Sequence, residues 1–211
     1  MKRILLLVLL FFMSVNLVFA NNYDGKFIAR KKLEDFNFRF ETEYRKKENK
    51  LNRRHYDFGL EVPLKNDWLV SINYRSIYRH RDDNWQLEKR RYVQISKAFK
   101  SEFLKLTLRT RQEFRQRKEN ENSWRNRSRI MLKSRKEILK LKPFASNEFF
   151  YDFKEDKYNK NRISIGADLP KFSNFKPAIY YKIDSNLDEN SGRHKSWKSD
   201  YSVVFKLSVD F

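Results

Sequence analysis

Apolar and polar residues alternate along most of the chain. The first clear example begins at Phe36, where the apolar or aromatic residues Phe36, Phe38, Phe40, Thr42 and Tyr44 alternate with Asn37, Arg39, Glu41, Glu43 and Arg45. Successive side chains of a β-strand point to opposite faces, so this segment predicts a strand with one aromatic and one charged face. The pattern recurs in nine later segments, the last ending at Phe211, while helical periodicity is scarce. The chain is therefore predicted to be all-β, with about ten strands.

The connections between these segments alternate in character. Residues 46–54 and 79–89 are long and polar, whereas residues 65–67 and 100–102 are short. Outer-membrane barrels place long loops outside the cell and short turns on the periplasmic side. We therefore expect an antiparallel, up-and-down transmembrane β-barrel of about ten strands, with eight or twelve as alternatives and both termini on the periplasmic side.

The start of the chain predicts export. Met1-Lys2-Arg3 precedes an apolar run that ends at Val18-Phe19-Ala20, the arrangement of a secretory signal peptide with cleavage near Ala20. The alternative is a membrane-anchoring helix, but the run is short and lacks a basic stop after it. Cleavage would remove Lys2 and Arg3 and lower the net charge from +20 to +18. We expect a signal peptide at 1–20, a periplasmic N-terminal segment at 21–33 and an outer-membrane barrel at 34–211.

Composition limits the alternatives. Charged residues make up 35% of the chain and aromatic residues 16%, whereas a disordered polycation would be poor in aromatics. Cysteine is absent, which excludes thiolate metal sites and disulfides. A strongly basic chain can bind nucleic acid, but no recognition fold is evident, so no nucleic-acid partner is expected. We instead expect contact with outer-membrane lipids, including the phosphates of lipopolysaccharide.

Aromatic residues near strand ends are typical of the girdles at membrane–water interfaces. The chain also ends on an aromatic strand residue, which resembles the signal by which the barrel-assembly machinery recognises its clients, and that machinery is an expected partner. The predicted interface aromatics are Tyr44, Trp68, Tyr74, Trp124, Tyr151, Tyr201 and Phe211.

The polar faces of the strands predict a charged lumen. Like-charged side chains around a lumen attract ions of opposite sign, which indicates an anion-attracting passage. The alternative, which the narrow lumen favours, is a plug of salt bridges that fixes strand register. The predicted network consists of Arg39, Glu41, Glu43, Glu61, Arg109, Arg111, Glu113, Arg125, Arg127, Arg129, Glu148, Arg162, Asp168 and Lys182.

Three stretches resemble a known family. They are Pro143-Phe144-Ala145-Ser146-Asn147-Glu148-Phe149-Phe150-Tyr151, Asn161-Arg162-Ile163-Ser164-Ile165-Gly166 and Lys176-Pro177-Ala178-Ile179-Tyr180-Tyr181. They are similar to segments of the bacterial domain of unknown function 2490, and residues 40–45 fit its first strand. The resemblance implies an outer-membrane barrel over nearly the whole mature chain and implies no known activity.

An outer-membrane hydrolase acting on lipid or peptide is the alternative function. His194-Lys195-Ser196 has the His-x-Ser spacing of the outer-membrane phospholipase and lipid A deacylase families, in which the imidazole deprotonates the hydroxyl. Those families need a third, orienting group about a dozen residues later, and Ser208 stands near that position. His194 and Ser196 are therefore weak catalytic candidates. The three histidines are too scattered along the chain to predict a metal site, and no cofactor is expected.

Overall fold

The described part of the protein consists of strands alone. A computed structural model describes residues 22–48, 50–81, 83–117, 121–188 and 196–211, and the predicted signal peptide lies outside these ranges. Within them, no helix is long and apolar enough to cross a membrane. The strands are β1 (Asn22–Lys32), β2 (Asn37–Lys47), β3 (Lys50–Pro63), β4 (Trp68–Arg81), β5 (Asn84–Lys100), β6 (Leu104–Arg117), β7 (Ser123–Ser134), β8 (Lys142–Asp152), β9 (Lys157–Asp168), β10 (Phe175–Asp188) and β11 (Ser196–Asp210).

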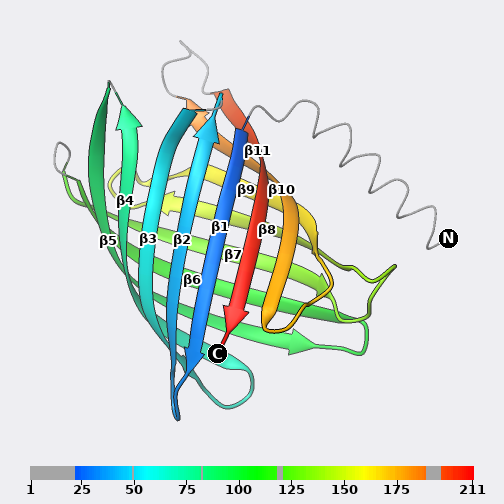
Figure 1. Ribbon diagram of the computed structural model, residues 1–211. Coiled ribbons are helices and arrows are strands. Elements are labelled where there is room, and N and C mark those ends of the chain that lie inside the picture. Colours follow the sequence, from blue (N-terminus) through cyan, green and yellow to red (C-terminus); the bar gives the residue numbers. More distant parts are fainter. Residues whose placement is uncertain (1–21, 49, 82, 118–120, 189–195) are drawn as a thin grey trace.

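The eleven strands close into one barrel, which confirms the predicted fold class. Consecutive strands pair antiparallel, and β1 and β11 close the barrel side by side and in parallel (Figure 1). Because the strand number is odd, the first and last strands run the same way. The start of β1 and the end of β11 therefore lie at opposite rims, so the expectation of both termini on one side is wrong. We call the rim where the odd-numbered strands begin the upper rim, and the rim where β11 ends the lower rim.

Strand β1 corrects one predicted boundary. Residues 21–33 were expected to precede the barrel, but β1 pairs with β2 along its whole length and with β11 from Tyr23 to Arg30. The alternation that revealed the other strands is weak here. The outward positions include the small residues Gly25 and Ala29, and the apolar Ile28 points inward and is buried.

The two long polar connections predicted at residues 46–54 and 79–89 belong mostly to the strands that they join. Strands β2 and β3 pair until Lys47 lies opposite Lys50, and β4 and β5 pair until Arg81 lies opposite Asn84. Polar residues at the ends of these hairpins satisfy the ladder as well as apolar ones do, since the hydrogen bonds belong to the backbone. Tight turns at Asn66–Asp67 and Asp83 have positive φ, a conformation that Asn and Asp tolerate.

Apolar side chains of the barrel point outward. Among the described residues, 34 large hydrophobic side chains are exposed, while nine hydrophobic residues are buried and 25 polar or charged residues are buried. This is the inverse of a water-soluble sheet, whose apolar face is buried. The exposed residues form a belt around the barrel, which we call the apolar belt. Strand β5 contributes Phe99, Ile95 and Val93 to it.

Lys97 interrupts this belt on β5 without placing its charge within it. Its ammonium lies 5.2 Å from the Trp68 ring and donates a hydrogen bond to the Asn66 carbonyl in the lower-rim turn. The long side chain thus covers apolar surface while its charge reaches the rim. In the same turn, a hydrogen bond from Lys100 holds the pKa of Asp67 below its ordinary value.

Candidate functional site: the charged interior

The predicted interior charges share one cavity. Thirteen of the fourteen line it, and the other, Glu113, is fully buried and hydrogen-bonded to arginines that do. Strand alternation places them there, because each lies at an inward position of its strand. The residues on the cavity wall are Arg39, Glu41, Glu43, Glu61, Arg109, Arg111, Arg125, Arg127, Arg129, Glu148, Arg162, Asp168 and Lys182.

Glu113 of β6 is the centre of one ion-pair cluster. Its Oε2 accepts hydrogen bonds from Arg125 at 2.6 Å and Arg90 at 3.2 Å. Its Oε1 accepts from Arg127 at 2.7 Å and Arg111 at 3.4 Å. One carboxylate therefore joins strands β5, β6 and β7, and a buried charge with this many donors is well compensated.

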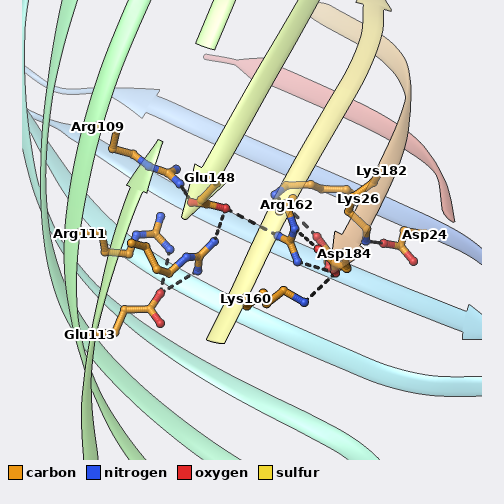
Figure 2. Close-up of polar contacts among 12 residues, drawn as sticks. Asp24, Lys26, Arg109, Arg111, Glu113, Glu148, Lys160, Arg162, Lys182 and Asp184 are labelled. Carbon is orange, nitrogen blue, oxygen red and sulfur yellow. Dashed lines mark hydrogen bonds and ion pairs between the residues drawn. The ribbon is translucent and has the colours of Figure 1, made fainter. Parts of the chain in front are cut away.

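Glu148 of β8 continues this network around the wall (Figure 2). It accepts hydrogen bonds from Arg109 and, at 2.9 Å, from Arg127. Arg162 of β9 lies 3.9 Å from Glu148 and donates to Asp184 of β10 at 2.5 and 2.8 Å. The bidentate contact between Arg162 and Asp184 is the strongest form of such a pair and fixes the β9–β10 register.

Asp57 of β3 is the centre of a second cluster, with hydrogen-bond donors from three other strands. Tyr92 of β5 donates its hydroxyl to Asp57 at 2.5 Å, and Arg75 of β4 donates to the same carboxylate. Arg39 of β2 lies at 3.5 Å. Asp57 is fully buried, so the loss of any of these donors would leave a charged group less compensated.

Strand β1 completes the interior with two charges, Asp24 and Lys26, that lie outside the predicted network. Lys26 lies 2.9 Å from Glu41 and 3.7 Å from Glu43, both on β2. Asp24 accepts a hydrogen bond from Lys182 of β10, the second strand from β1 beyond β11 (Figure 2). These contacts exist because β1 lies between β2 and β11, so they could be found only once the closing strand was known.

A histidine also joins the interior. His55 lies with Glu41 and Glu43, and the three offer ligand atoms within 4.8 Å of one another. The spacing of the histidines along the sequence did not predict this cluster. It forms because the β2–β3 register brings His55 opposite Glu43. Within the described structure, Glu41 already forms ion pairs with Lys26, Arg39 and Arg75, so cations compensate the charge of this carboxylate.

Two rows of like charge each contain one arginine for which no acidic partner is found in the described structure. Arg109 lies opposite Arg129 on the inner faces of β6 and β7, and Arg53 lies between Arg45 and Arg79. Within the described residues, neither Arg129 nor Arg53 forms an ion pair, and the Nε of each is buried without a hydrogen-bond partner. Like charges directly opposite each other are unfavourable, so the placement of these arginines lowers the stability of the folded barrel.

The space that remains between these side chains is a cavity of about 780 Å³. Among the described residues on its wall are 22 Lys or Arg and seven Asp or Glu. Five more carboxylates are buried in the same interior, Asp24, Asp57, Glu88, Glu113 and Asp184, which still leaves an excess of ten positive charges. The arrangement can attract and hold anions.

The predicted interface aromatics all lie on the outer face. Tyr44, Trp68, Tyr74, Trp124, Tyr201 and Phe211 are exposed, and Tyr151 is half-buried against Phe153 and Tyr158. Trp124 and Tyr151 lie near the upper rim, and Trp68 and Phe211 near the lower rim. Tyr74 differs, because it lies midway along β4, opposite Phe58.

Of the two catalytic candidates, the structure describes only Ser196. Ser196 is exposed at the first position of β11, and His194 lies outside the described residues. The third-group position, Ser208, is buried on the inner face toward the other end of the same strand.

The fold and interior define a class: a closed β-barrel with an apolar outer belt and an ion-paired, arginine-rich interior. Over residues 20–193 the chain matches the family described as protein of unknown function (DUF2490), and it belongs to that family. The three stretches that carried the resemblance lie on the neighbouring strands β8, β9 and β10. No curated protein matches the chain.

Proposed function

We propose that this protein is a bacterial outer-membrane barrel whose interior forms a narrow passage for small anions. The observation that carries the proposal is the excess of arginine and lysine on the wall of the 780 Å³ cavity. A low-dielectric wall that presents one sign of charge concentrates ions of the other sign.

The outer surface supports a membrane location. Exposed apolar residues surround the barrel, and each described strand has a neighbour on both sides in the closed barrel. A closed barrel is one of the two structures whose backbone can be satisfied within lipid. The charged start and the apolar run that ends at Val18-Phe19-Ala20 support export.

The competing function is a closed structural barrel, and the dense ion pairs around Glu113 favour it. Nothing in the described residues supports the hydrolase alternative.

A conductance measurement distinguishes the anion passage from the closed structural barrel. Refolded protein whose gel mobility shifts on heating is added to a planar bilayer, and discrete, anion-selective current steps are expected.

Arg129 is the most informative residue to change, because its replacement breaks no ion pair in the described structure. Arg129→Glu is expected to reduce or reverse the anion preference. Lys171→Glu makes the same charge change in an exposed turn at the lower rim and is expected to leave the preference nearly unchanged. If folded, inserted protein shows no conductance, the proposed passage is contradicted. If the protein does not insert into lipid at all, the membrane location is contradicted.

A further inference from the structure

The outer face of the barrel contains a hollow that the interior function does not use. It has a volume of about 650 Å³ and extends over strands β2 to β7. Its wall is almost entirely apolar, and Phe38, Phe58, Ile72, Val93, Phe114 and Trp124 contribute to it. A hollow of this kind, open along the apolar belt, fits a hydrocarbon chain.

One charged residue, Arg91, lines this hollow within the described part of the chain. It is exposed on the outer face of β5, opposite Tyr74 on one side and Phe114 on the other. No acidic residue of the described chain pairs with it. Lys89, two residues toward the upper rim on the same face, is likewise exposed and without an acidic partner. Two uncompensated cations thus stand where the apolar run of β5 ends.

Neutral hydrogen-bonding groups continue from Arg91 across the next strands. Gln112 of β6 lines the hollow, and Thr110, Asn126 and Ser128 lie beside it on the outer faces of β6 and β7. Asn126 donates to Thr110 at 3.0 Å, and Ser128 donates to Asn126 at 2.9 Å. These groups suit the ester, glycerol or sugar oxygens of a lipid headgroup better than they suit acyl chains.

We propose that the hollow binds a phosphate-bearing membrane lipid. An acyl chain lies in the apolar hollow, the Arg91 guanidinium donates paired hydrogen bonds to the phosphate, and Lys89 adds a second positive charge. Arginine is suited to this role because its planar fork matches two phosphate oxygens. The inference rests on the membrane location proposed above, but it does not depend on an open interior.

A second copy of this chain fits the hollow less well. A two-fold contact would place the same patch on both copies and bring Arg91 and Lys89 toward their own counterparts. No acid in the described patch would neutralise them, and facing like charges disfavour such a contact. A lipid phosphate supplies the missing negative charge.

The test uses the full mature protein, folded in neutral detergent and checked by its heat-dependent gel mobility. Native mass spectrometry measures retention of phosphatidylglycerol and of a galactosyl diacylglycerol with the same acyl chains and no phosphate. Wild-type protein is expected to retain the phosphate-bearing lipid preferentially. Arg91→Gln should weaken that retention about tenfold, the loss expected for one charge-assisted hydrogen-bonding group.

Two variants control this result. Arg54→Gln changes another outward arginine on the upper half of the barrel, one that contacts Tyr78 and Trp85 and does not line the hollow, and should retain lipid as wild type does. Val93→Trp fills the hollow and should reduce retention of both lipids.

Three outcomes would overturn the proposal: Arg91→Gln retaining phosphatidylglycerol like wild type, the galactolipid binding equally well, or inorganic phosphate alone displacing the bound lipid. A dimer that Arg91→Gln abolishes would also overturn it, in favour of contact between copies. Protein that never folds in detergent contradicts the membrane location itself, whereas folded protein without lipid selectivity contradicts this site alone.

Discussion

The rings of Phe144 and Tyr180 contact each other across Gly166, with their centroids 5.7 Å apart. Gly166 of β9 lies opposite Phe144 of β8 on one side and opposite Tyr180 of β10 on the other. All three belong to the stretches that carried the family resemblance. The missing side chain lets the two rings meet over the backbone, so the glycine is required by close packing rather than by its φ angle.

Gly166→Ala is therefore expected to destabilise the barrel. A Cβ added there would lie 2.2 Å from the Ile179 carbonyl oxygen and 2.3 Å from the Tyr180 Cβ, and neither can move without shifting β10. We expect a loss of about 3 kcal/mol, at the upper end of overpacking costs. Urea unfolding of the protein in detergent micelles measures the change.

Gly25→Ala is the matched control for that experiment, because a Cβ at Gly25 of β1 would meet nothing within 4 Å. Its effect should stay within about 0.5 kcal/mol, as for most surface substitutions. Equal effects of the two variants would show that strand propensity, and not the Phe144–Tyr180 contact, sets the requirement.

The like-charge pair Arg109 and Arg129 leads to a second prediction. Glu148 accepts hydrogen bonds from Arg109 and Arg127, so Glu148→Gln leaves buried arginines with less compensation. Removing one partner from a buried ion-pair network costs about 3–5 kcal/mol. Arg129→Gln removes a charge with no acidic partner in the described structure and should cost less than about 1 kcal/mol or stabilise the barrel. The same unfolding assay compares the variants, and a larger loss from Arg129→Gln would contradict the assignment of unpaired charge.

Much of this interior could be predicted from the sequence, because strand alternation assigns each residue to a face. Arg39 and Phe40 are neighbours in sequence yet lie on opposite faces, and a period of two is sufficient to separate them. Which charges pair could not be predicted. Arg115 and Asp152 lie 3.2 Å apart although β6 and β8 are not adjacent, so their contact depends on register and on barrel curvature together.

The closing strand could not be predicted for a different reason. Its outward positions include Gly25 and Ala29, which are too small to give an apolar signal, and its partner β11 lies at the other end of the chain. The ion pair of Lys26 with Glu41 and the cluster around His55 depend on that closure or on hairpin register. The outer hollow was missed as well, because it arises from side-chain size around Arg91 on six strands rather than from a motif.

A third prediction concerns the Tyr92 hydroxyl, which donates to the fully buried Asp57 at 2.5 Å. Tyr92→Phe keeps the ring between Arg75 and Arg111, whose guanidinium carbons lie 5.5 and 4.0 Å from its centroid, and removes only the donor. A hydrogen bond to a charged group contributes about 1.5–3 kcal/mol, so a loss in this range is expected on urea unfolding. Tyr74→Phe, on the outer face of β4, is the control and should change stability little, since no hydrogen bond of its hydroxyl is found in the described structure. Asn73 also donates to Asp57, at 3.2 Å. If Tyr92→Phe left the stability unchanged, Arg39, Arg75 and Asn73 would compensate the Asp57 charge without Tyr92.

The parallel closure of β1 on β11 can be tested directly, because the chain has no cysteine of its own. Ala29 and Val209 are register partners on the outer face, and paired strands lie about 4.8 Å apart, within the Cα separation that a disulfide bridges. Ala29→Cys combined with Val209→Cys should form an intramolecular disulfide on mild oxidation, seen as a gel shift that a reducing agent reverses. Ala29→Cys combined with Ser208→Cys places the thiols on opposite faces and should not cross-link. If both pairs cross-linked equally, or neither did, β1 would not occupy its register against β11, and the charges that Lys26 and Asp24 bring to the interior would have to be placed elsewhere.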